Sequence, residues 1–210
     1  MTRQQDNLRG SVQLQELVLP PHRPKTTSLP SHHHDNVHRL NPLFSPTLIS
    51  PTVQSQLPPS YTCRPIQRSD YHSGFLDVLR VLTTVGDVSE AQWNERYDWM
   101  SARNDEYFLL CILNGEDRIV GTGTLVVERK FIHNLGIVGH IEDIAVAKDQ
   151  QGKKLGLRII QALDFVAEKV GCYKSILDCS EANEGFYVKC GFKRAGLEMA
   201  HYYEPPKGHA

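Results

Sequence analysis

The segment from residue 140 to residue 171 constrains this chain most, because it predicts a strand, a tight loop and a long amphipathic helix in direct succession. The strand is apolar at Ile141 and over 144–146. In the helix, apolar residues recur at spacings of three and four, which places them on one buried face. They are Leu155, Ile159, Ile160, Leu163, Val166, Ala167 and Val170. Gly171 follows where a left-handed helix cap is expected. The segment therefore predicts an α/β unit.

The loop Gln150–Gly156 has the features of a phosphate-binding turn. The first turn of the following helix presents unpaired backbone N–H groups and the positive end of the helix dipole, and Lys153 and Lys154 add positive charge. The loop matches neither GxxxxGK[ST] nor GxGxxG. An ordinary strand-to-helix turn therefore stays open as the alternative.

The rest of the chain from Tyr61 onward predicts a sheet that begins with an antiparallel meander. Pro65 marks the first strand as an edge strand, and Asn114–Asp117 forms a hairpin turn between the second and third. The predicted strands cover 61–66, 107–113, 119–127, 137–146, 175–179 and 192–203.

Three further helices are predicted around this sheet. Ser69 or Asp70 caps a helix with Phe75, Leu76, Leu79 and Leu82 on one side. Ser89 and Gln92 form a capping box for a helix with Trp93, Tyr97 and Met100 in register. A last helix covers 182–190 and ends at Gly191. Together the elements predict one α/β domain with a mixed, mostly antiparallel sheet flanked by helices.

Residues 1–58 differ in composition from the rest, since they hold most of the 12 prolines and half of the 10 histidines. This extension has too little periodic apolar surface to offset the entropy of ordering. We expect it to be largely disordered and the folded domain to span 59–210. The apolar residues Leu43, Phe44, Leu48 and Ile49 either dock on the domain or belong to a dispersed linker, which we favour. We expect His32–His34 to bind metals only adventitiously.

Composition excludes several classes of function. The net charge of −1 gives no electrostatic case for nucleic acid or an anionic membrane. No apolar run approaches the roughly 20 residues of a membrane span, and Val12–Leu19 is too polar for a signal peptide. Five cysteines without a CxxC pair fit a reducing compartment. We therefore expect a cytoplasmic protein.

Acidic residues interrupt two of the predicted strands. Glu142 and Asp143 are adjacent, so strand alternation places them on opposite faces and at least one in a cleft or the interior. A buried carboxylate is costly unless it is paired or used, and a salt bridge to a neighbouring helix is the structural alternative. Asp178 lies between Leu177 and Cys179 in the next strand. These acids predict a polar site at the middle or C-terminal edge of the sheet, whereas Tyr187 alone is typical of a core residue.

Four motifs together resemble the GNAT superfamily of acetyl-CoA-dependent N-acetyltransferases. They are His140–Val146, Gln151–Gly156, Gly171–Cys179 and Asn183–Phe192. Val81–Gly86 and Glu128–His133 extend the resemblance to the eukaryotic, particularly fungal, glucosamine-6-phosphate N-acetyltransferases, over residues 61–203. The resemblance implies a GNAT fold and acetyl transfer from acetyl-CoA to the 2-amino group of D-glucosamine 6-phosphate. The product, N-acetylglucosamine 6-phosphate, would supply UDP-GlcNAc biosynthesis.

The resemblance implies an acetyl-CoA site on the motif (Q/R)xxGx(G/A), which aligns with Gln151–Gly156. Lys154 replaces the first motif glycine, and we expect it to be tolerated because a residue entering a helix needs no positive φ. The backbone over 144–146 would pair with the pantetheine arm and polarise the thioester carbonyl. The implied coenzyme contacts are Ile144, Ala145, Val146, Gln151, Gly152, Lys153, Lys154, Leu155, Gly156, Leu157, Asn183, Tyr187 and Lys189.

The resemblance also implies a catalytic set and an acceptor site. Glu142 and Asp143 would bind the sugar and orient or deprotonate its amine, and Asp178 would fix the amine against the thioester. Tyr187 would protonate the departing thiolate. The implied sugar and phosphate contacts are Thr83, Lys130, His133, Glu142, Asp143, Tyr173, Lys174 and Asp178. In relatives, the equivalents of Tyr173 and Lys174 come from a partner subunit, so a homodimer is implied. The relatives' C-terminal basic phosphate contact has no clear counterpart in His201–Tyr203.

We expect direct transfer in a ternary complex, without a metal. An acyl-enzyme route through Cys179 stays open as an alternative mechanism. Two other functions also stay open: an acetyltransferase for another amine, and a non-catalytic coenzyme-binding module. The basic residues Lys130, His133 and Lys174 favour a phosphorylated acceptor, and the presence of Asp178 and Tyr187 favours an enzyme.

Overall fold

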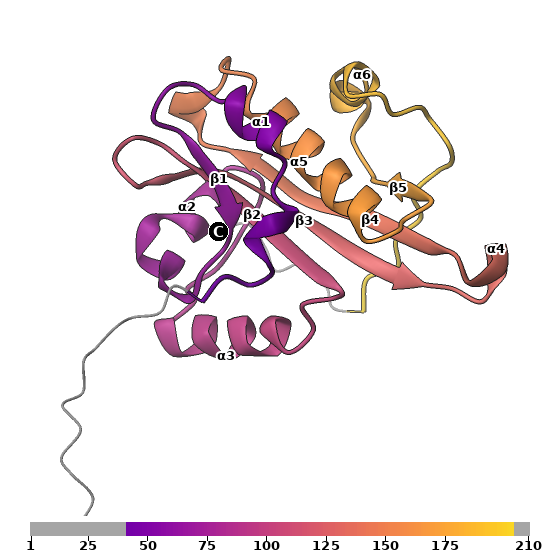
Figure 1. The fold of residues 1–210 in the computed structure, drawn as a ribbon, viewed down its shortest axis with the longest axis horizontal. Coiled ribbons are helices and arrows are strands. Elements are labelled where there is room, and N and C mark those ends of the chain that lie inside the picture. The colour runs from indigo at the N-terminus through magenta and orange to yellow at the C-terminus, as the bar shows by residue number, and fades with distance from the viewer. Residues whose placement is uncertain (1–40, 204–210) are drawn as a thin grey trace, which may run out of the picture. The chain divides into compact units, whose positions relative to one another are not determined.

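A computed structural model describes residues 41–203 of this chain. Within that range, five strands form one mixed sheet in the order β1-β2-β3-β4-β5, in which only the β4–β5 pair is parallel (Figure 1). The strands are β1 (Thr62–Pro65), β2 (Tyr107–Leu113), β3 (Ile119–Arg129), β4 (Ile137–Val146) and β5 (Lys174–Ile176).

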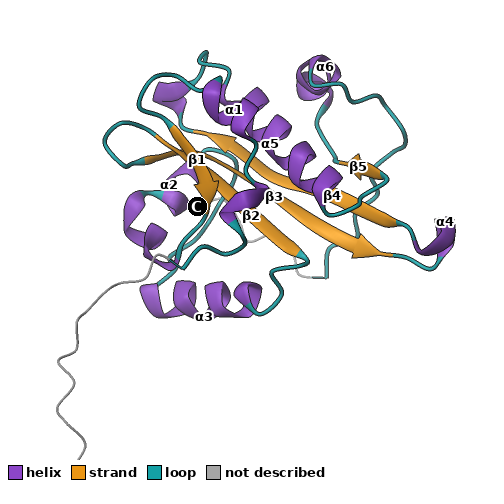
Figure 2. Ribbon diagram, in the orientation of Figure 1, coloured by secondary structure: helices purple, strands orange, loops and turns teal. Residues whose placement is uncertain are grey.

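Helices cover both faces of the sheet, with α1 and α5 on one face and α2 and α3 on the other (Figure 2). The α-helices are α1 (Pro51–Ser55), α2 (Phe75–Leu79), α3 (Glu90–Ser101), α4 (Ile132–Leu135), α5 (Leu155–Lys169) and α6 (Glu181–Lys189). The 3₁₀ turns are η1 (Pro46–Leu48), η2 (Arg68–Ser73) and η3 (Lys148–Gln150). Between residues 41 and 203, none of these helices has the length and apolarity of a bilayer span.

Helix α5 packs closely on the sheet because β3 carries glycine where the two elements meet. A Cβ atom at Gly123 would lie 2.5 Å from Ile159 Cγ2 and 3.0 Å from Leu163 Cδ1. Both Ile159 and Leu163 are completely buried. The absence of a side chain at Gly123 therefore sets the distance between α5 and the sheet.

Much of the predicted local structure is confirmed. The strands 107–113 and 137–146 have the predicted bounds, and the strand from Ile119 runs two residues further, to Arg129. The Ser89–Gln92 capping box opens α3. Gly171 and Gly191 follow the C-terminal ends of α5 and α6 and have left-handed φ values of +88° and +100°.

The domain boundary at residue 58 is wrong for residues 41–58. Leu43 and Phe44 are buried in the core, where the Phe44 ring contacts that of Phe108 at a centroid distance of 5.3 Å. The Leu43 N–H donates to Ile66 O. A short apolar patch that finds an open sheet edge is ordered by burial, which its own lack of periodicity does not reveal. The expectations for residues 1–40, including His32–His34, lie outside the described residues.

The helix predicted from Ser69 to Leu82 is also corrected. Asp70 does not cap it from the front but is the third residue of η2, where its carboxylate accepts from the Gln67 N–H and pairs with Arg64 at 2.7 Å. Gly74, at φ +89°, separates η2 from α2. α2 ends at Leu79, which leaves Leu82 half exposed.

Two predictions at the C-terminal end are wrong. The strand predicted over 175–179 is β5, which covers Lys174–Ile176 only and is not buried. No strand forms over 192–203, where Leu197 is 90% exposed. A strand needs a neighbour to accept and donate backbone hydrogen bonds, and this segment has none among the described residues.

Candidate active site

A β-bulge in β4 carries the acidic pair. Thr124 is opposite Glu142 and Thr122 is opposite Ala145, so Asp143 and Ile144 share one position across from Gly123. Asp143 has a φ of +53°, which few non-glycine residues adopt. The simple alternation that we expected is therefore broken, and both carboxylates are exposed rather than buried. Bulges of this kind redirect side chains next to functional sites.

The bulge gives the two acids different surroundings. Asp143 faces a cavity beneath α3, described below. Glu142 lies within electrostatic reach of Asp178 and Glu198. Partial burial raises the pKa of Glu142 above its ordinary value, and the negative charges of Asp143 and Asp178 raise it further, while His140 opposes the shift. Glu142 therefore holds a proton more readily than an ordinary glutamate does.

Among the described residues, the β5-facing edge of β4 is unpaired after His140. Pairing with β5 ends at His140–Ile176, so the β5-facing edge over 141–146 has no strand partner in the described part of the chain. Ala145 is buried there, while Ile144 and Val146 are partly buried. A row of unpaired backbone groups binds an extended ligand as an added strand does.

The loop after β4 leads to an uncapped helix N-terminus. No side chain caps α5, and its first turn contains no acid, so the N–H groups of Leu155, Gly156 and Leu157 have no helical acceptor. Gly152 and Lys154 both have positive φ, at +85° and +60°. Our expectation that Lys154 needs no positive φ is therefore wrong. The loop turns left-handed at that position, which costs a residue with a Cβ about 1–2 kcal/mol.

A three-residue cluster holds this loop to the start of β1. The Lys153 ammonium donates to Tyr61 Oη at 2.8 Å and to Gln150 Oε1 at 2.6 Å. The Tyr61 hydroxyl donates to the same Gln150 oxygen at 2.7 Å. The positive charge of Lys153 is thereby held beside the helix N-terminus, while Gln151 is exposed.

Tyr187 lies half buried on α6, between the rings of Phe186 and Phe192 at centroid distances of 5.0 and 6.3 Å. Burial raises the pKa of its phenol, and the nearby Cys179 and Cys190 raise it further. The phenol is therefore protonated at neutral pH. α6 itself is held against the start of α5, where a Cβ at Gly156 would lie 3.3 Å from the Phe186 ring. Asn183 and Lys189 are exposed on the same helix.

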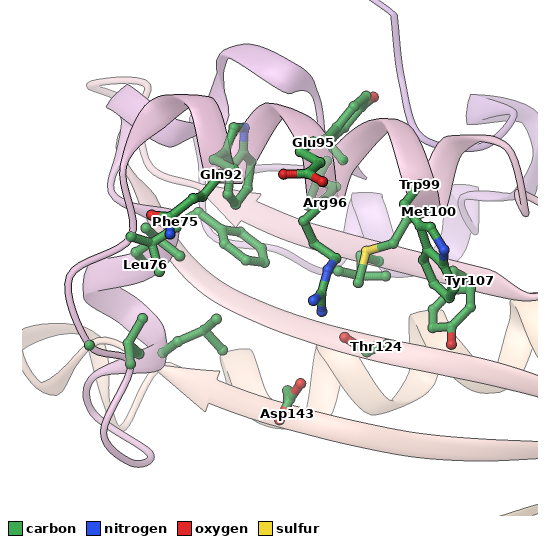
Figure 3. A pocket seen from close by; sticks show the side chains of 18 of the residues that line it. Phe75, Leu76, Gln92, Glu95, Arg96, Trp99, Met100, Tyr107, Thr124 and Asp143 are labelled. Carbon is green, nitrogen blue, oxygen red and sulfur yellow. The ribbon is translucent and has the colours of Figure 1, made fainter.

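A cavity of about 930 Å³, which we term the α3 cavity, lies near these residues between α2, α3 and the sheet (Figure 3). Thr124 and Asp143 form part of its floor and Arg96, Trp99 and Met100 part of its roof. Sequence reasoning missed Arg96, Trp99 and Tyr107, because nothing in the local pattern of α3 or β2 indicates which outward positions face a cavity. Thr83 lines a shallower hollow of about 550 Å³ that shares Val85, Gly86 and Asp87 with it.

Four predicted acceptor contacts, Lys130, His133, Tyr173 and Lys174, instead form a hairpin-tip cluster. The His133 ring lies 4.9 Å from that of Tyr173, and Lys130 pairs with Glu128 at 2.6 Å. The Tyr173 N–H donates to Ile137 O at the start of β4. Ile137 and Asp143 are six positions apart along β4, or roughly 20 Å of extended chain, whereas Lys130 shares the Glu128 carboxylate with His140, which is two residues before Glu142. Tyr173 therefore meets β4 too far from Asp143 of its own chain to share a small ligand with it at that point, whereas Lys130 is not separated from the acids in this way.

Comparison with known proteins agrees with this geometry. Residues 73–192 match the Acetyltransferase (GNAT) family. A Candida albicans protein named glucosamine 6-phosphate N-acetyltransferase is 49% identical over 143 residues, which are 68% of this chain and 96% of that protein. A Dictyostelium discoideum protein named glucosamine 6-phosphate N-acetyltransferase 1 is 44% identical over 69% of this chain and 92% of its own length. The crystal structure of glucosamine-6-phosphate N-acetyltransferase from Arabidopsis thaliana superposes with a TM-score of 0.67 at 34% identity, covering 69% of this chain and 99% of that one.

Proposed function

Because this chain belongs to the GNAT acetyltransferases, and within them to the glucosamine 6-phosphate N-acetyltransferase family, we propose that it acetylates the 2-amino group of D-glucosamine 6-phosphate from acetyl-CoA. One observation carries the proposal: the bulge places Asp143 and Glu142 directly before an open strand edge and an uncapped helix N-terminus. Acids for an amine and backbone donors for a coenzyme thus lie within one short segment.

Acetyl-CoA fits the segment 141–157, which we term the coenzyme segment. The N–H groups at the start of α5 and the charge of Lys153 suit a pyrophosphate, and the open edge of β4 suits the extended pantetheine arm. A β4 N–H that faces the thioester carbonyl would stabilise negative charge on its oxygen. As co-substrate, acetyl-CoA supplies an activated acetyl group. Gln151, Asn183 and Lys189 are proposed as outer contacts of the coenzyme.

Carboxylates at and near the bulge would prepare the acceptor. Asp143 and Asp178 would hold and orient the amine, and Glu142 would accept its proton, directly or through water. Its raised pKa makes the Glu142 carboxylate a stronger base than an ordinary glutamate. The neutral amine would then attack the acetyl carbonyl carbon. A carbon–nitrogen bond forms as the carbon–sulfur bond breaks, so the amine loses one proton and the thiolate gains one.

Tyr187 would supply the proton to the departing sulfur. A phenol whose pKa is raised by burial keeps its proton at neutral pH, as a general acid must before transfer. The exposed Cys179 near Tyr187 leaves an acyl-cysteine route as a competing mechanism. Full turnover by Cys179→Ala would exclude it.

We also propose that the active form is a homodimer. The Tyr173 backbone joins β4 at Ile137, roughly 20 Å of strand from Asp143 of its own chain, which supports delivery of Tyr173 and Lys174 to a second copy. Large apolar side chains around the cluster are exposed to solvent: Phe131 is 94% exposed, and Ile132 and Leu135 are also exposed. Contiguous exposed apolar surface is typical of protein interfaces.

The function is tested by thiol release from acetyl-CoA, read with DTNB, with glucosamine 6-phosphate or glucosamine as acceptor. We expect strong turnover of the phosphorylated sugar and little of the other. Equal rates would contradict the phosphate-binding assignment, and no turnover of either sugar would favour another amine or a non-catalytic module. Sedimentation at several concentrations tests the dimer.

A further inference from the structure

The α3 cavity has an uneven charge distribution. Asp87, Glu95 and Asp143 are among its lining residues, and the single lysine or arginine in that lining, within the described part of the chain, is Arg96. Among the charged side chains of this lining, Arg96 therefore attracts an anion, whereas Asp87, Glu95 and Asp143 repel one.

Arg96 is placed to meet such an anion. Its side chain extends from α3 toward the sheet, into the space above Thr124 and across from Asp143 (Figure 3). Neighbouring arginines are engaged: Arg68 pairs with Asp98, and Arg80 pairs with Asp77 at 2.6 Å. By contrast, Arg96 takes part in none of the hydrogen bonds or ion pairs found between residues 41 and 203. It is a solvent-exposed cation on the cavity wall that has no protein partner among the described residues.

The two charges that face each other across the cavity match the two charges of an amino-sugar phosphate. A guanidinium binds phosphate through two parallel hydrogen bonds, and a carboxylate binds an ammonium group. Resting on the proposed function, we propose that Arg96 binds the phosphate of the acceptor while Asp143 holds its amino end. Arg96 thereby takes up the phosphate contact for which the C-terminal residues His201–Tyr203 offer no clear counterpart, and it sets the preference for a phosphorylated sugar.

The chain offers a matched control for this assignment. Arg96→Gln removes the charge and keeps the length of the side chain, and Arg96→Lys keeps the charge without the bidentate fork. Arg68→Gln removes one charge from the surface beside α3, outside the cavity lining. The thermal unfolding midpoint of each variant shows whether the fold is retained.

Two measurements test the proposal. In the thiol-release assay, Arg96→Gln is expected to lower kcat/KM for glucosamine 6-phosphate about ten- to hundredfold, to leave kcat/KM for glucosamine almost unchanged, and to leave KM for acetyl-CoA unchanged. Arg96→Lys should fall in between and Arg68→Gln should match the wild type. In calorimetric titration of the wild type and Arg96→Gln with glucose 6-phosphate, which has the phosphate but no amine, binding should weaken by a similar factor.

The outcomes separate this inference from the proposed function. Equal losses with both sugars, or no loss with either, would overturn the role of Arg96 while the proposed function stands. Absence of turnover by the wild type would overturn the proposed function, and the titration with glucose 6-phosphate would still decide whether Arg96 binds a sugar phosphate. Wild-type-like binding by Arg96→Gln in that titration overturns the assignment.

Discussion

The coenzyme segment and the α3 cavity are built in different ways, although they meet at Asp143. The coenzyme segment is one continuous stretch of chain. Its loop is held in place by hydrogen bonds among the side chains of Tyr61, Gln150 and Lys153. The cavity is assembled from α2, α3 and three strands, and its one cation has no protein partner among the described residues. The first region therefore depends on contacts within one segment, and the second depends on how helices and strands pack together.

We expect the largest effect from a substitution that removes the proposed proton donor. Tyr187→Phe should lower kcat about 10²–10⁴-fold, because it removes the proposed proton donor and little else. KM for both substrates should stay near the wild-type values. Steady-state thiol release at neutral pH measures this, and an unchanged kcat would mean that solvent protonates the thiolate.

A substitution at the bulge should affect the acceptor alone. Asp143→Asn is expected to lower kcat/KM for glucosamine 6-phosphate about ten- to hundredfold, because the carboxylate that faces the α3 cavity loses its charge. KM for acetyl-CoA should not change. If KM for the coenzyme rises as much, the bulge serves both sites and the separation drawn above is wrong.

The packing beneath both regions is tested at Gly123. Gly123→Val should lower the free energy of unfolding by about 1–3 kcal/mol, because a Cβ there already overlaps Ile159 Cγ2. Chemical denaturation measures the loss. Gly196→Val is a control, since Gly196 has nothing within 4 Å of its Cβ position, and equal losses at the two positions would contradict the role given to Gly123.

A weaker effect is expected at the hydrogen bonds that connect the start of β1 with the coenzyme loop. Tyr61→Phe removes the hydroxyl that bonds Gln150 and Lys153, so KM for acetyl-CoA should rise roughly two- to tenfold. kcat and KM for the sugar should stay unchanged. A change in the sugar KM instead would show that the two regions are mechanically coupled.

The smallest effect concerns Asp164 on α5, where burial raises the pKa of the carboxyl to about 6. The folded state therefore loses stability relative to the unfolded one as the pH rises from about 4 to 6. Asp164→Asn should increase the free energy of unfolding by about 1 kcal/mol at pH 8, after allowance for partial exposure, and by almost nothing at pH 4. Urea unfolding at the two pH values checks this, and a gain that persists at pH 4 would rule out ionisation as its cause.

Prediction from sequence was most accurate where structure depends on neighbours along the chain. The bounds of β2 and β4 follow from local apolar runs, and the capping box of α3 follows from local hydrogen bonds. Prediction failed where a segment depends on a distant partner. Leu43 and Phe44 gain burial from a sheet edge, and residues 192–203 lack a neighbouring strand in the described chain.

The candidate site divides in the same way. The motif at 151–156 could be recognised from its letters, but the left-handed turn at Lys154 could not, because lysine has no intrinsic preference for that conformation. Arg96 escaped notice for a related reason. Whether an outward position of α3 faces solvent or a cavity depends on where the helix packs, and its own sequence does not encode that.

By itself, the sequence determined the bounds of β2 and β4, the amphipathic face of α5 and the presence of acids before a glycine-bearing loop. These depend on residue spacing and on short-range backbone geometry. Only the tertiary structure decided that the bulge at Asp143 separates the two acids, that Tyr173 joins β4 roughly 20 Å of strand from Asp143, and that Arg96 lines the cavity. Each of these is a relation between segments far apart in the chain, and such relations are set by how helices and sheet pack together.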